Sequence, residues 1–272
     1  MFDFIKNQLT KKNIELVSCI SLEECEIKRP YLLQRHGIES GSVIIFAVPY
    51  LSRELLKKRN VSAYASARDY HLFFAELFEE LIQTIKENYP SNKFCGFTDH
   101  SPINEIDAAA KCSLGVVGRN HLLITKEYSS YVFIGEIITD ACLPSFAGEI
   151  KHCLNCGICE QKCPVKMKNG ECLSALTQKK GELSDEEKAS ITAHQCAWGC
   201  DICQEVCPHT RQAIENETIF TNIEFFKTSL TPFLNSEQIE NMSDSEFNQR
   251  AYSWRGKNVI LRNLKYLEGK ES

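Results

Sequence analysis

Residues 153–164 read CLNCGICEQKCP, and this stretch decides how the chain around it must fold. Its cysteines have the spacing C-x2-C-x2-C-x3-C-P, in which the two-residue gaps let three thiolates of one tight loop reach three corners of a single cubane cluster. The cysteine that precedes the proline is directed to a neighbouring cluster. A second half-motif, CDICQEVCP, covers residues 200–208. Two such halves predict two [4Fe–4S] clusters in a bacterial-ferredoxin-like module.

The crossover pattern divides the thiolates between the two clusters. The first cluster is expected to take Cys153, Cys156, Cys159 and Cys207. The second is expected to take Cys163, Cys200, Cys203 and one further thiolate, which is either Cys172 or Cys196. A structural zinc site is the alternative. Zinc binds four thiolates at a time and has no use for the third cysteine of the first motif or for the paired Cys-Pro endings.

The remaining composition is that of an ordinary globular protein, with 43% hydrophobic and 25% charged residues. The net charge of −5 gives no general attraction to polyanions. The N-terminus does not look like a secretory signal, and no apolar run is long enough to span a membrane, so we expect a cytoplasmic protein. The other five cysteines have the pattern of small buried apolar residues: Cys19, Cys25, Cys95, Cys112 and Cys142.

Helical and strand patterns alternate ahead of the cysteines and predict an α+β domain. Helices are expected over 2–17, 66–88 and 106–114, and strands over 42–49, 94–98, 121–125 and 131–138. After residue 153, Cys, Gly and Pro replace the periodic pattern, so metal must supply stability there. Ser184 and Glu187 have capping-box spacing for a helix over 184–194, and one or two helices are expected over 243–267. We therefore predict three parts: 1–147, 148–212 and 213–272.

Four segments before the cysteines occur in an order that resembles the epoxyqueuosine reductase family. They are SAYASARDYH (62–71), TDHSPI (98–103), KCSLGVVGRN (111–120) and FIGEIITD (133–140). After the cysteines, FNQR (247–250) and RGKNVILRN (255–263) are similar to the family's returning C-terminal segment. Each piece is short, but six in the correct order around a two-cluster module are specific. Longer members carry a helical-repeat extension, and we expect a short, divergent member that lacks it.

The resemblance implies a function and cofactors. The family couples a cobalamin-binding domain to two [4Fe–4S] clusters and removes the epoxide oxygen in the last step of queuosine synthesis in tRNA. We therefore expect 1–147 to be a corrinoid and substrate domain, and 213–272 to be a helical segment that packs back on the core. Expected partners are an external low-potential donor of the ferredoxin or flavodoxin type and tRNA. The family pattern also favours Cys172 over Cys196 as the eighth cluster ligand.

The resemblance also assigns roles to single residues. Asp99 corresponds to the family's aspartate that donates a proton, which is needed because opening an epoxide leaves an alkoxide. A strand-end turn or a helix N-cap is the alternative role for Asp99. Asp107, eight residues further on, is a weaker candidate for the acid. The residues expected to line the corrinoid pocket are Ser62, Tyr64, Tyr70, His71, Ser101, Gly118 and Asn120. For the two tyrosines the alternative is an aromatic core, and for Gly118 it is a plain turn between a helix and a strand.

A second function fits the same cysteines. An N-terminal domain that no longer binds a corrinoid would leave a ferredoxin-like electron-transfer protein. Cobalt binding separates the two hypotheses, because the reductase needs a corrinoid for the epoxide or a related substrate and the electron carrier does not.

Overall fold

The computed structural model describes residues 1–165 and 172–270 of the chain. Contacts divide the chain into two compact units. Unit 1 comprises Met1–Pro49, Phe73–Cys156 and Gln212–Ile223, and unit 2 comprises Tyr50–Leu72, Gly157–Arg211 and Glu224–Ser272. The boundary at residues 156 and 157 falls inside the first cysteine motif. The three-part division predicted from the sequence stays a prediction, and its cluster module includes residues 166–171, which lie outside the described part.

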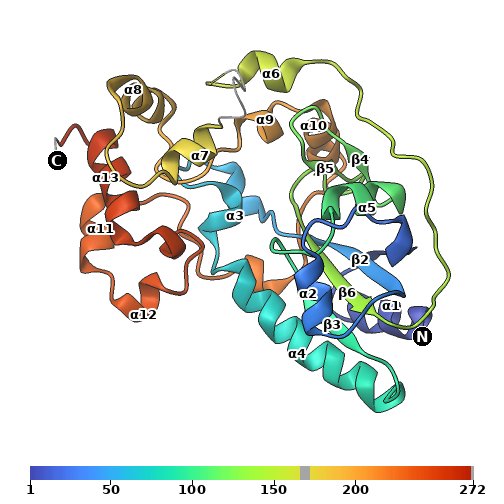
Figure 1. The fold of residues 1–272 in the computed structure, drawn as a ribbon. Coiled ribbons are helices and arrows are strands. Elements are labelled where there is room, and N and C mark those ends of the chain that lie inside the picture. The colour runs from blue at the N-terminus through green and yellow to red at the C-terminus, as the bar shows by residue number, and fades with distance from the viewer. Residues whose placement is uncertain (166–171, 271–272) are drawn as a thin grey trace. The chain divides into compact units, whose positions relative to one another are not determined.

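A four-stranded antiparallel sheet forms the centre of unit 1, in the order β1-β2-β6-β3 (Figure 1). Its strands are β1 (Leu16–Ser21), β2 (Ser42–Pro49), β3 (Phe94–Phe97) and β6 (Val132–Thr139). All eight residues of β2 are buried, as expected of an apolar strand between two neighbours. On β6, Glu136 pairs with Ile45 of β2 and Phe97 of β3. A carboxyl group therefore lies in the middle of an apolar sheet.

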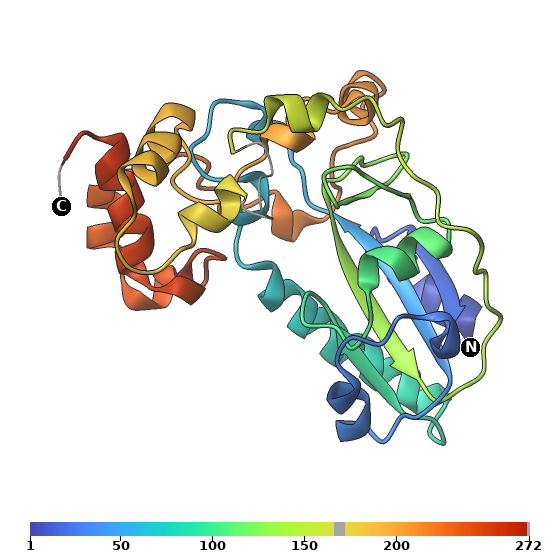
Figure 2. The ribbon, with the colours of Figure 1, turned by 45° about the horizontal axis from the view of Figure 1, so that its top comes forward.

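Helices cover the sheet and a small hairpin adjoins it. The helices are α1 (Phe2–Thr10), α2 (Pro30–Arg35), α4 (Tyr70–Asn88) and α5 (Glu105–Lys111), with a 3-10 turn at Leu22–Glu24. The hairpin consists of β4 (Val116–Val117) and β5 (Leu123–Ile124). Figure 2 shows α5 crossing the front of the sheet. The alanines of α5 pack there with Ile45, Ile134 and Ile138, so Glu136 shares the face that α5 covers.

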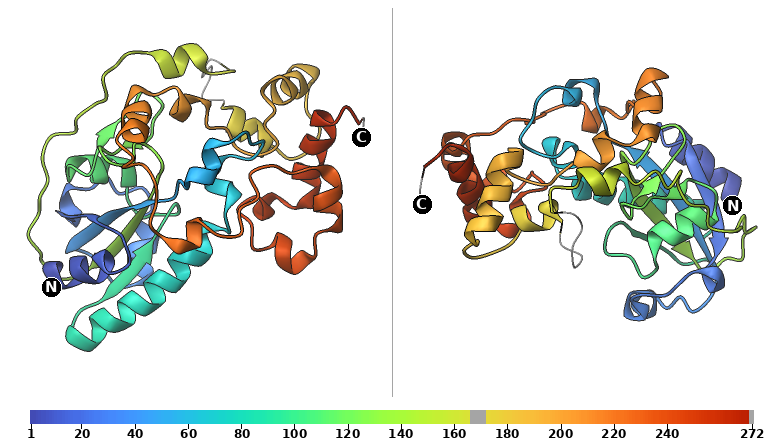
Figure 3. Two further views of the ribbon diagram at one scale, coloured as in Figure 1. Left: turned by 180° about the vertical axis from the view of Figure 1, so that it is seen from behind. Right: turned by 90° about the horizontal axis from the view of Figure 1, so that it is seen from above.

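Unit 2 is mostly helical. Its helices are α3 (Ala63–Ser66), α6 (Ile158–Lys162), α7 (Leu173–Thr177), α8 (Asp185–His194), α9 (Ile202–Glu205), α11 (Ser236–Asn241), α12 (Asp244–Phe247) and α13 (Lys257–Leu267), and α10 (Pro208–Glu215) leads back to unit 1. Within the described residues of this unit, 3-10 turns lie at Arg53–Leu56, Glu224–Phe226 and Ser253–Arg255. Helix α13 packs against α8 and α11, which lie beside it in both views of Figure 3. Helix α6, which carries Cys159, contacts α9, which carries Cys203.

Most predicted elements are present, with one clear error. The helix predicted over 2–17 ends at Thr10, and strand β1 begins at Leu16. Asn13 adopts a left-handed backbone (φ 62°), which ends the helix and turns the chain into the sheet. The strand predicted over 121–125 is reduced to Leu123–Ile124, and the long helix begins at Tyr70 rather than at residue 66. The capping box of Ser184 and Glu187 is confirmed.

Candidate active site and cluster-binding segments

The turn that carries Asp99 lies between β3 and α5 in unit 1. Asp99 is exposed and adopts a left-handed backbone (φ 63°), which is unfavourable for a residue other than glycine. Helix α5 is capped by Asn104, whose side chain accepts a hydrogen bond from the backbone N–H of Asp107. Asp99 is therefore not the N-cap of this helix. Of the predicted roles, the strand-end turn agrees with its backbone conformation, and the acid stays a prediction.

Two glutamates lie close to this turn. The carboxyl group of Glu105 accepts a hydrogen bond from the backbone N–H of Asp99. Burial, followed by the charge of Asp99, raises the pKa of Glu105 to about 7. Glu136 is fully buried, and its Oε2 accepts a hydrogen bond from Ser101 at 2.5 Å. Burial, followed by the charge of Glu105, raises the pKa of Glu136 well above the usual range of a carboxyl group.

The hydroxyl group of Ser101 thus makes its hydrogen bonds within the protein. Its hydroxyl donates to Glu136 and accepts a hydrogen bond from the backbone N–H of Ile103 at 3.1 Å, and the residue is 1% exposed. The Arg29 guanidinium donates to the backbone carbonyl of Ser101 at 2.9 Å. The structure therefore joins the predicted residues Asp99 and Ser101 into one site and adds Arg29, Glu105 and Glu136 to it.

Sequence reasoning assigned no role to Glu105 or Glu136. One signal for Glu136 was available: a carboxylate in the apolar run of residues 132–139 cannot stay charged in a packed sheet without compensation. Glu105 carried no comparable signal, because glutamate is common in the first turn of a helix.

Two residues of the first cysteine motif are attached to the β4–β5 hairpin of unit 1. The backbone N–H of Cys153 donates to the carbonyl of Val117 at 3.0 Å, and Arg119 donates to the side chain of Asn155 at 2.6 Å. Gly118 lies in the turn of this hairpin, where a Cβ atom would come within 2.2 Å of the Asn120 side-chain oxygen. A tight turn therefore accounts for the glycine, and the predicted contact of Gly118 and Asn120 with a cofactor stays a prediction.

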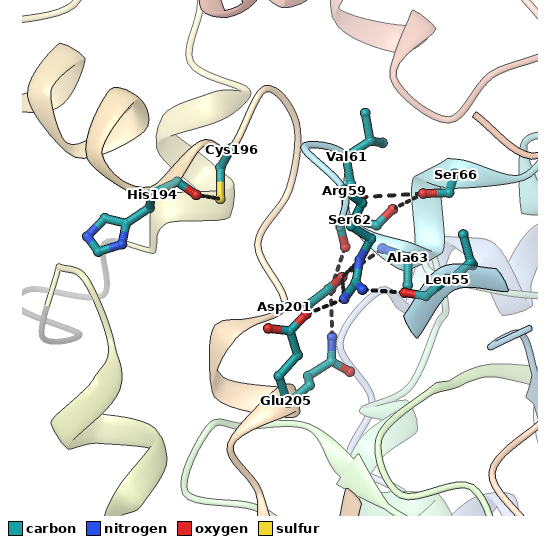
Figure 4. A network of polar contacts seen from close by, with 11 residues as sticks. Leu55, Arg59, Val61, Ser62, Ala63, Ser66, His194, Cys196, Asp201 and Glu205 are labelled. Carbon is teal, nitrogen blue, oxygen red and sulfur yellow. Dashed lines mark hydrogen bonds and ion pairs between the residues drawn. The ribbon is translucent and has the colours of Figure 1, made fainter. Parts of the chain in front are cut away.

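The second cysteine half is attached to the 59–63 segment within unit 2. Asp201 lies between Cys200 and Cys203 and is 6% exposed. Its carboxylate accepts hydrogen bonds from the Ser62 hydroxyl at 2.5 Å, the backbone N–H of Ala63 at 2.7 Å and the Arg59 guanidinium at 2.9 Å (Figure 4). Charge-assisted bonds of this kind hold a loop firmly. Neither Asp201 nor Arg59 was predicted to have a role, because these two residues lie about 140 positions apart in the chain.

Three other predicted pocket residues lie in the same unit. The hydroxyl of Tyr64 accepts a hydrogen bond from the indole N–H of Trp198 at 3.0 Å, two residues before Cys200. Tyr70 is buried and stacks on the ring of His71, with ring centroids 4.2 Å apart. His71 is exposed and its Nδ1 lies 2.9 Å from the Asp69 carboxylate. Ser62 and Tyr64 are therefore brought to the segment of Cys200, and Tyr70 and His71 form a separate pair.

Both candidates for the eighth ligand lie near Cys200. Burial raises the pKa of Cys172, and the charges of Cys200 and Cys163 add to this effect. Cys196 contacts Cys200 through a side-chain hydrogen bond that raises the pKa of Cys200. Within residues 1–165 and 172–270, no three His, Cys, Asp or Glu side chains are arranged so that they could hold a metal ion. The donors around Cys200 are thiols, which suits iron–sulfur chemistry better than that of hard cations.

The five cysteines outside the motifs mostly follow the prediction. Cys19, Cys95 and Cys112 are buried and Cys25 is partly buried. Burial raises the pKa of Cys19, Cys25 and Cys95 to about 12, so these thiols stay neutral. Cys142 is exposed, so the prediction of a buried residue is wrong there. It lies just after β6, where the chain leaves the sheet.

Comparison with known proteins agrees with this architecture. The family model for epoxyqueuosine reductase QueG, DUF1730, matches residues 34–100. A curated epoxyqueuosine reductase of Listeria monocytogenes is 33% identical over 245 residues, which are 83% of this chain and 63% of the relative. That of Lactococcus garvieae is 33% identical over 74% of this chain and 59% of the relative. The chain belongs to the epoxyqueuosine reductase family. It spans about three fifths of the length of these two relatives.

Solved structures support the same fold for this member of the epoxyqueuosine reductase family. A structure of epoxyqueuosine reductase from Streptococcus thermophilus matches with a TM-score of 0.77 at 23% identity, over 98% of this chain and 80% of the other. An epoxyqueuosine reductase with an epoxyqueuosine-modified tRNA-Tyr stem loop matches with a TM-score of 0.76 at 21% identity, over 98% and 80%. The predictions of the family and of the α+β class are confirmed. No helix in the described residues is long and apolar enough to cross a membrane.

Proposed function

We propose that this chain is an oxidoreductase that removes the epoxide oxygen of a queuosine precursor in tRNA, or of a related substrate. The observation that supports this most directly is the combination, in one family member, of the two-cluster cysteine set with the exposed Asp99 turn. Curated relatives that match most of this chain are named epoxyqueuosine reductases.

Acid catalysis is the step that the chain's own side chains can perform. Reduction of an epoxide to an alkene takes up two electrons and two protons and releases water, so the oxygen must be protonated as it leaves. Asp99 is exposed, so a substrate can reach it. In a Bacillus subtilis epoxyqueuosine reductase, whose fold this chain shares at a TM-score of 0.75 and 19% identity, a catalytic aspartate loop is swung out of the active site. By similarity we assign the acid to Asp99.

Two [4Fe–4S] clusters and a corrinoid, when bound, would supply the low-potential electrons. We propose that the cluster ligands are Cys153, Cys156, Cys159 and Cys207 for one and Cys163, Cys172, Cys200 and Cys203 for the other. The corrinoid contacts are proposed for Ser62, Tyr64, Tyr70, His71, Ser101, Gly118 and Asn120. Ser62 and Ser101 each make buried hydrogen bonds within their own unit. A tRNA partner and a ferredoxin or flavodoxin donor complete the proposal.

Anaerobic reconstitution with iron, sulfide and cobalamin tests this function. The desalted protein is expected to hold about eight irons and one cobalt per chain. It should then convert epoxyqueuosine in a modified tRNA stem loop to queuosine, which mass spectrometry of the nucleosides detects. Eight irons without cobalt and without turnover would support the ferredoxin-like electron carrier instead. Protein without the iron step serves as the control.

A further inference from the structure

A fully buried carboxyl group lies beneath the Asp99 turn and lacks half of its hydrogen-bonding partners. Glu136 has no exposed surface, and among the described residues its Oε1 has no hydrogen-bond partner. Its surroundings are the apolar residues between the sheet and α5. An ionised carboxylate in such a place is strongly unfavourable, so Glu136 holds a proton at neutral pH.

Glu105 connects this buried group to the turn. It is the first residue of α5, and its carboxyl group accepts the backbone N–H of Asp99. Its Oε2 is shielded from solvent and has no hydrogen-bond partner within the described part of the chain. The turn therefore donates a hydrogen bond to a carboxyl group whose second oxygen has no partner among the described residues.

The turn needs such support because its backbone is strained. Asp99 has a φ of 63°, which lies in the left-handed region that disfavours residues with a Cβ atom. On the other side of Asp99, residues 101 and 102 are tied to the 28–29 segment. The carbonyl of Pro102 accepts the backbone N–H groups of Lys28 and Arg29, and the Arg29 side chain donates to the carbonyl of Ser101. Glu105 adds a contact at Asp99 itself.

We propose that Glu105 is a positioning residue for Asp99, which it holds in the left-handed turn through the backbone N–H, and that neutral Glu136 beneath it makes this arrangement possible. The inference rests on the proposed function in so far as Asp99 is the acid. A charged Glu136 would repel the Glu105 carboxylate, and a neutral one does not. The hydrogen bond from Ser101 to Glu136 keeps the lower group in place.

The strength of the hydrogen bond from the Asp99 backbone N–H to the Glu105 carboxyl group is expected to depend on pH. The charged groups that act on Glu105 are Asp99 and Arg29. The buried Glu136 below it is neutral, and so are the thiols of Cys25 and Cys95. A carboxylate accepts a hydrogen bond more strongly than a protonated carboxyl group does. The turn should therefore be tighter above the Glu105 pKa of about 7 and looser below it.

Hydrogen exchange at the Asp99 amide tests the contact without any substrate or cofactor. In Glu105→Ala this amide should exchange roughly ten-fold faster or more, because one hydrogen bond to a carboxylate is lost. Amides of β2 and β6 should be unchanged, which shows that the sheet is intact. Glu105→Gln should keep most of the protection, since its amide oxygen still accepts, and should lose the pH dependence near pH 7. Glu26→Gln, an exposed carboxyl beside the same loop, is the matched control.

The outcomes separate this inference from the proposed function. Unchanged exchange at Asp99 in Glu105→Ala, or an equal change in Glu26→Gln, would overturn the positioning role. In the reconstituted enzyme, Glu105→Ala should lower kcat roughly ten-fold with little change in KM, and Glu105→Gln should recover most of the rate. If exchange responds as expected but Asp99→Asn retains full turnover, the contact stands and the assignment of Asp99 as the acid fails.

Discussion

Arg59 Nη2 lies 2.9 Å from Asp201 Oδ2, and the two side chains are only 10% and 3% exposed. This buried ion pair joins the segment before α3 to the loop between Cys200 and Cys203. The Ser62 hydroxyl and the Ala63 backbone N–H bind the same carboxylate. Removing one partner of such a pair leaves an uncompensated buried charge, which costs more than the pair contributes when intact.

Arg59→Met should therefore lower the free energy of unfolding of unit 2 by about 3–5 kcal/mol. Both tryptophans, Trp198 and Trp254, lie in this unit, so their fluorescence during urea unfolding reports on it. A Trp254→Phe background leaves only the buried Trp198. Glu205→Gln removes a partner of Arg59 that is 49% exposed and should cost less than about 1 kcal/mol. Equal losses in the two variants would show that the buried pair has no special importance.

Asp99→Asn should abolish turnover in the reconstituted protein while both clusters stay intact. The amide retains the size of the carboxyl group but cannot donate a proton to a leaving oxygen, and general acid catalysis contributes roughly 10²–10⁴-fold. Nucleoside analysis of the tRNA stem loop measures the rate, and the visible spectrum measures the clusters. Asp107→Asn, on the adjacent helix, is the matched control. Near wild-type turnover in Asp99→Asn would remove Asp99 from the mechanism.

Serine variants of the two candidate cysteines should identify the eighth cluster ligand. Cys172→Ser should lose about four of the eight irons after reconstitution, and Cys196→Ser should keep all of them. Cys142→Ser, which changes an exposed cysteine outside the motifs, controls for handling and oxidation. The converse result would assign the ligand to Cys196, which contacts Cys200. Iron analysis and electron paramagnetic resonance of the reduced protein distinguish the cases.

Stability of unit 1 should fall as the pH rises from about 4.5 to about 7. The pKa of Glu105 is about 7 in the folded chain against an ordinary value of 4.5, so between these values the folded state binds more protons than the unfolded state. The loss from Glu105 is on the order of 3 kcal/mol and is constant above its folded pKa. Glu105→Gln should remove this part of the slope, and the part that comes from the raised pKa of buried Glu136 should remain. Urea unfolding followed by circular dichroism at several pH values measures it, and an unchanged slope in the variant would assign it to other groups.

The local pattern of apolar residues predicted much of the secondary structure correctly. It failed where strand pairing overrode the helical spacing. Strand β2 and helix α4 appear where the apolar run of 42–49 and the helical period of 70–88 predict them. Burial on one or both faces determines which consecutive residues are apolar, so a local pattern reveals it. The segment 11–17 continued the helical spacing of residues 2–10. It became a turn and the start of β1 because Leu16 and its neighbours pair with β2. Such pairing is decided by residues about thirty positions away.

By itself, the sequence determined the α+β class and the family, and it predicts the two-cluster cysteine set, because cluster ligation depends on spacings of two and three residues along the chain. Only the tertiary structure showed that Glu136 lies buried under the Asp99 turn, and that Asp201 binds Arg59 and Ser62. These contacts join β6 to the loop before α5, and the 59–63 segment to the second cysteine motif. The protonation of a carboxyl group depends on what surrounds it after folding, and no local pattern carries that information.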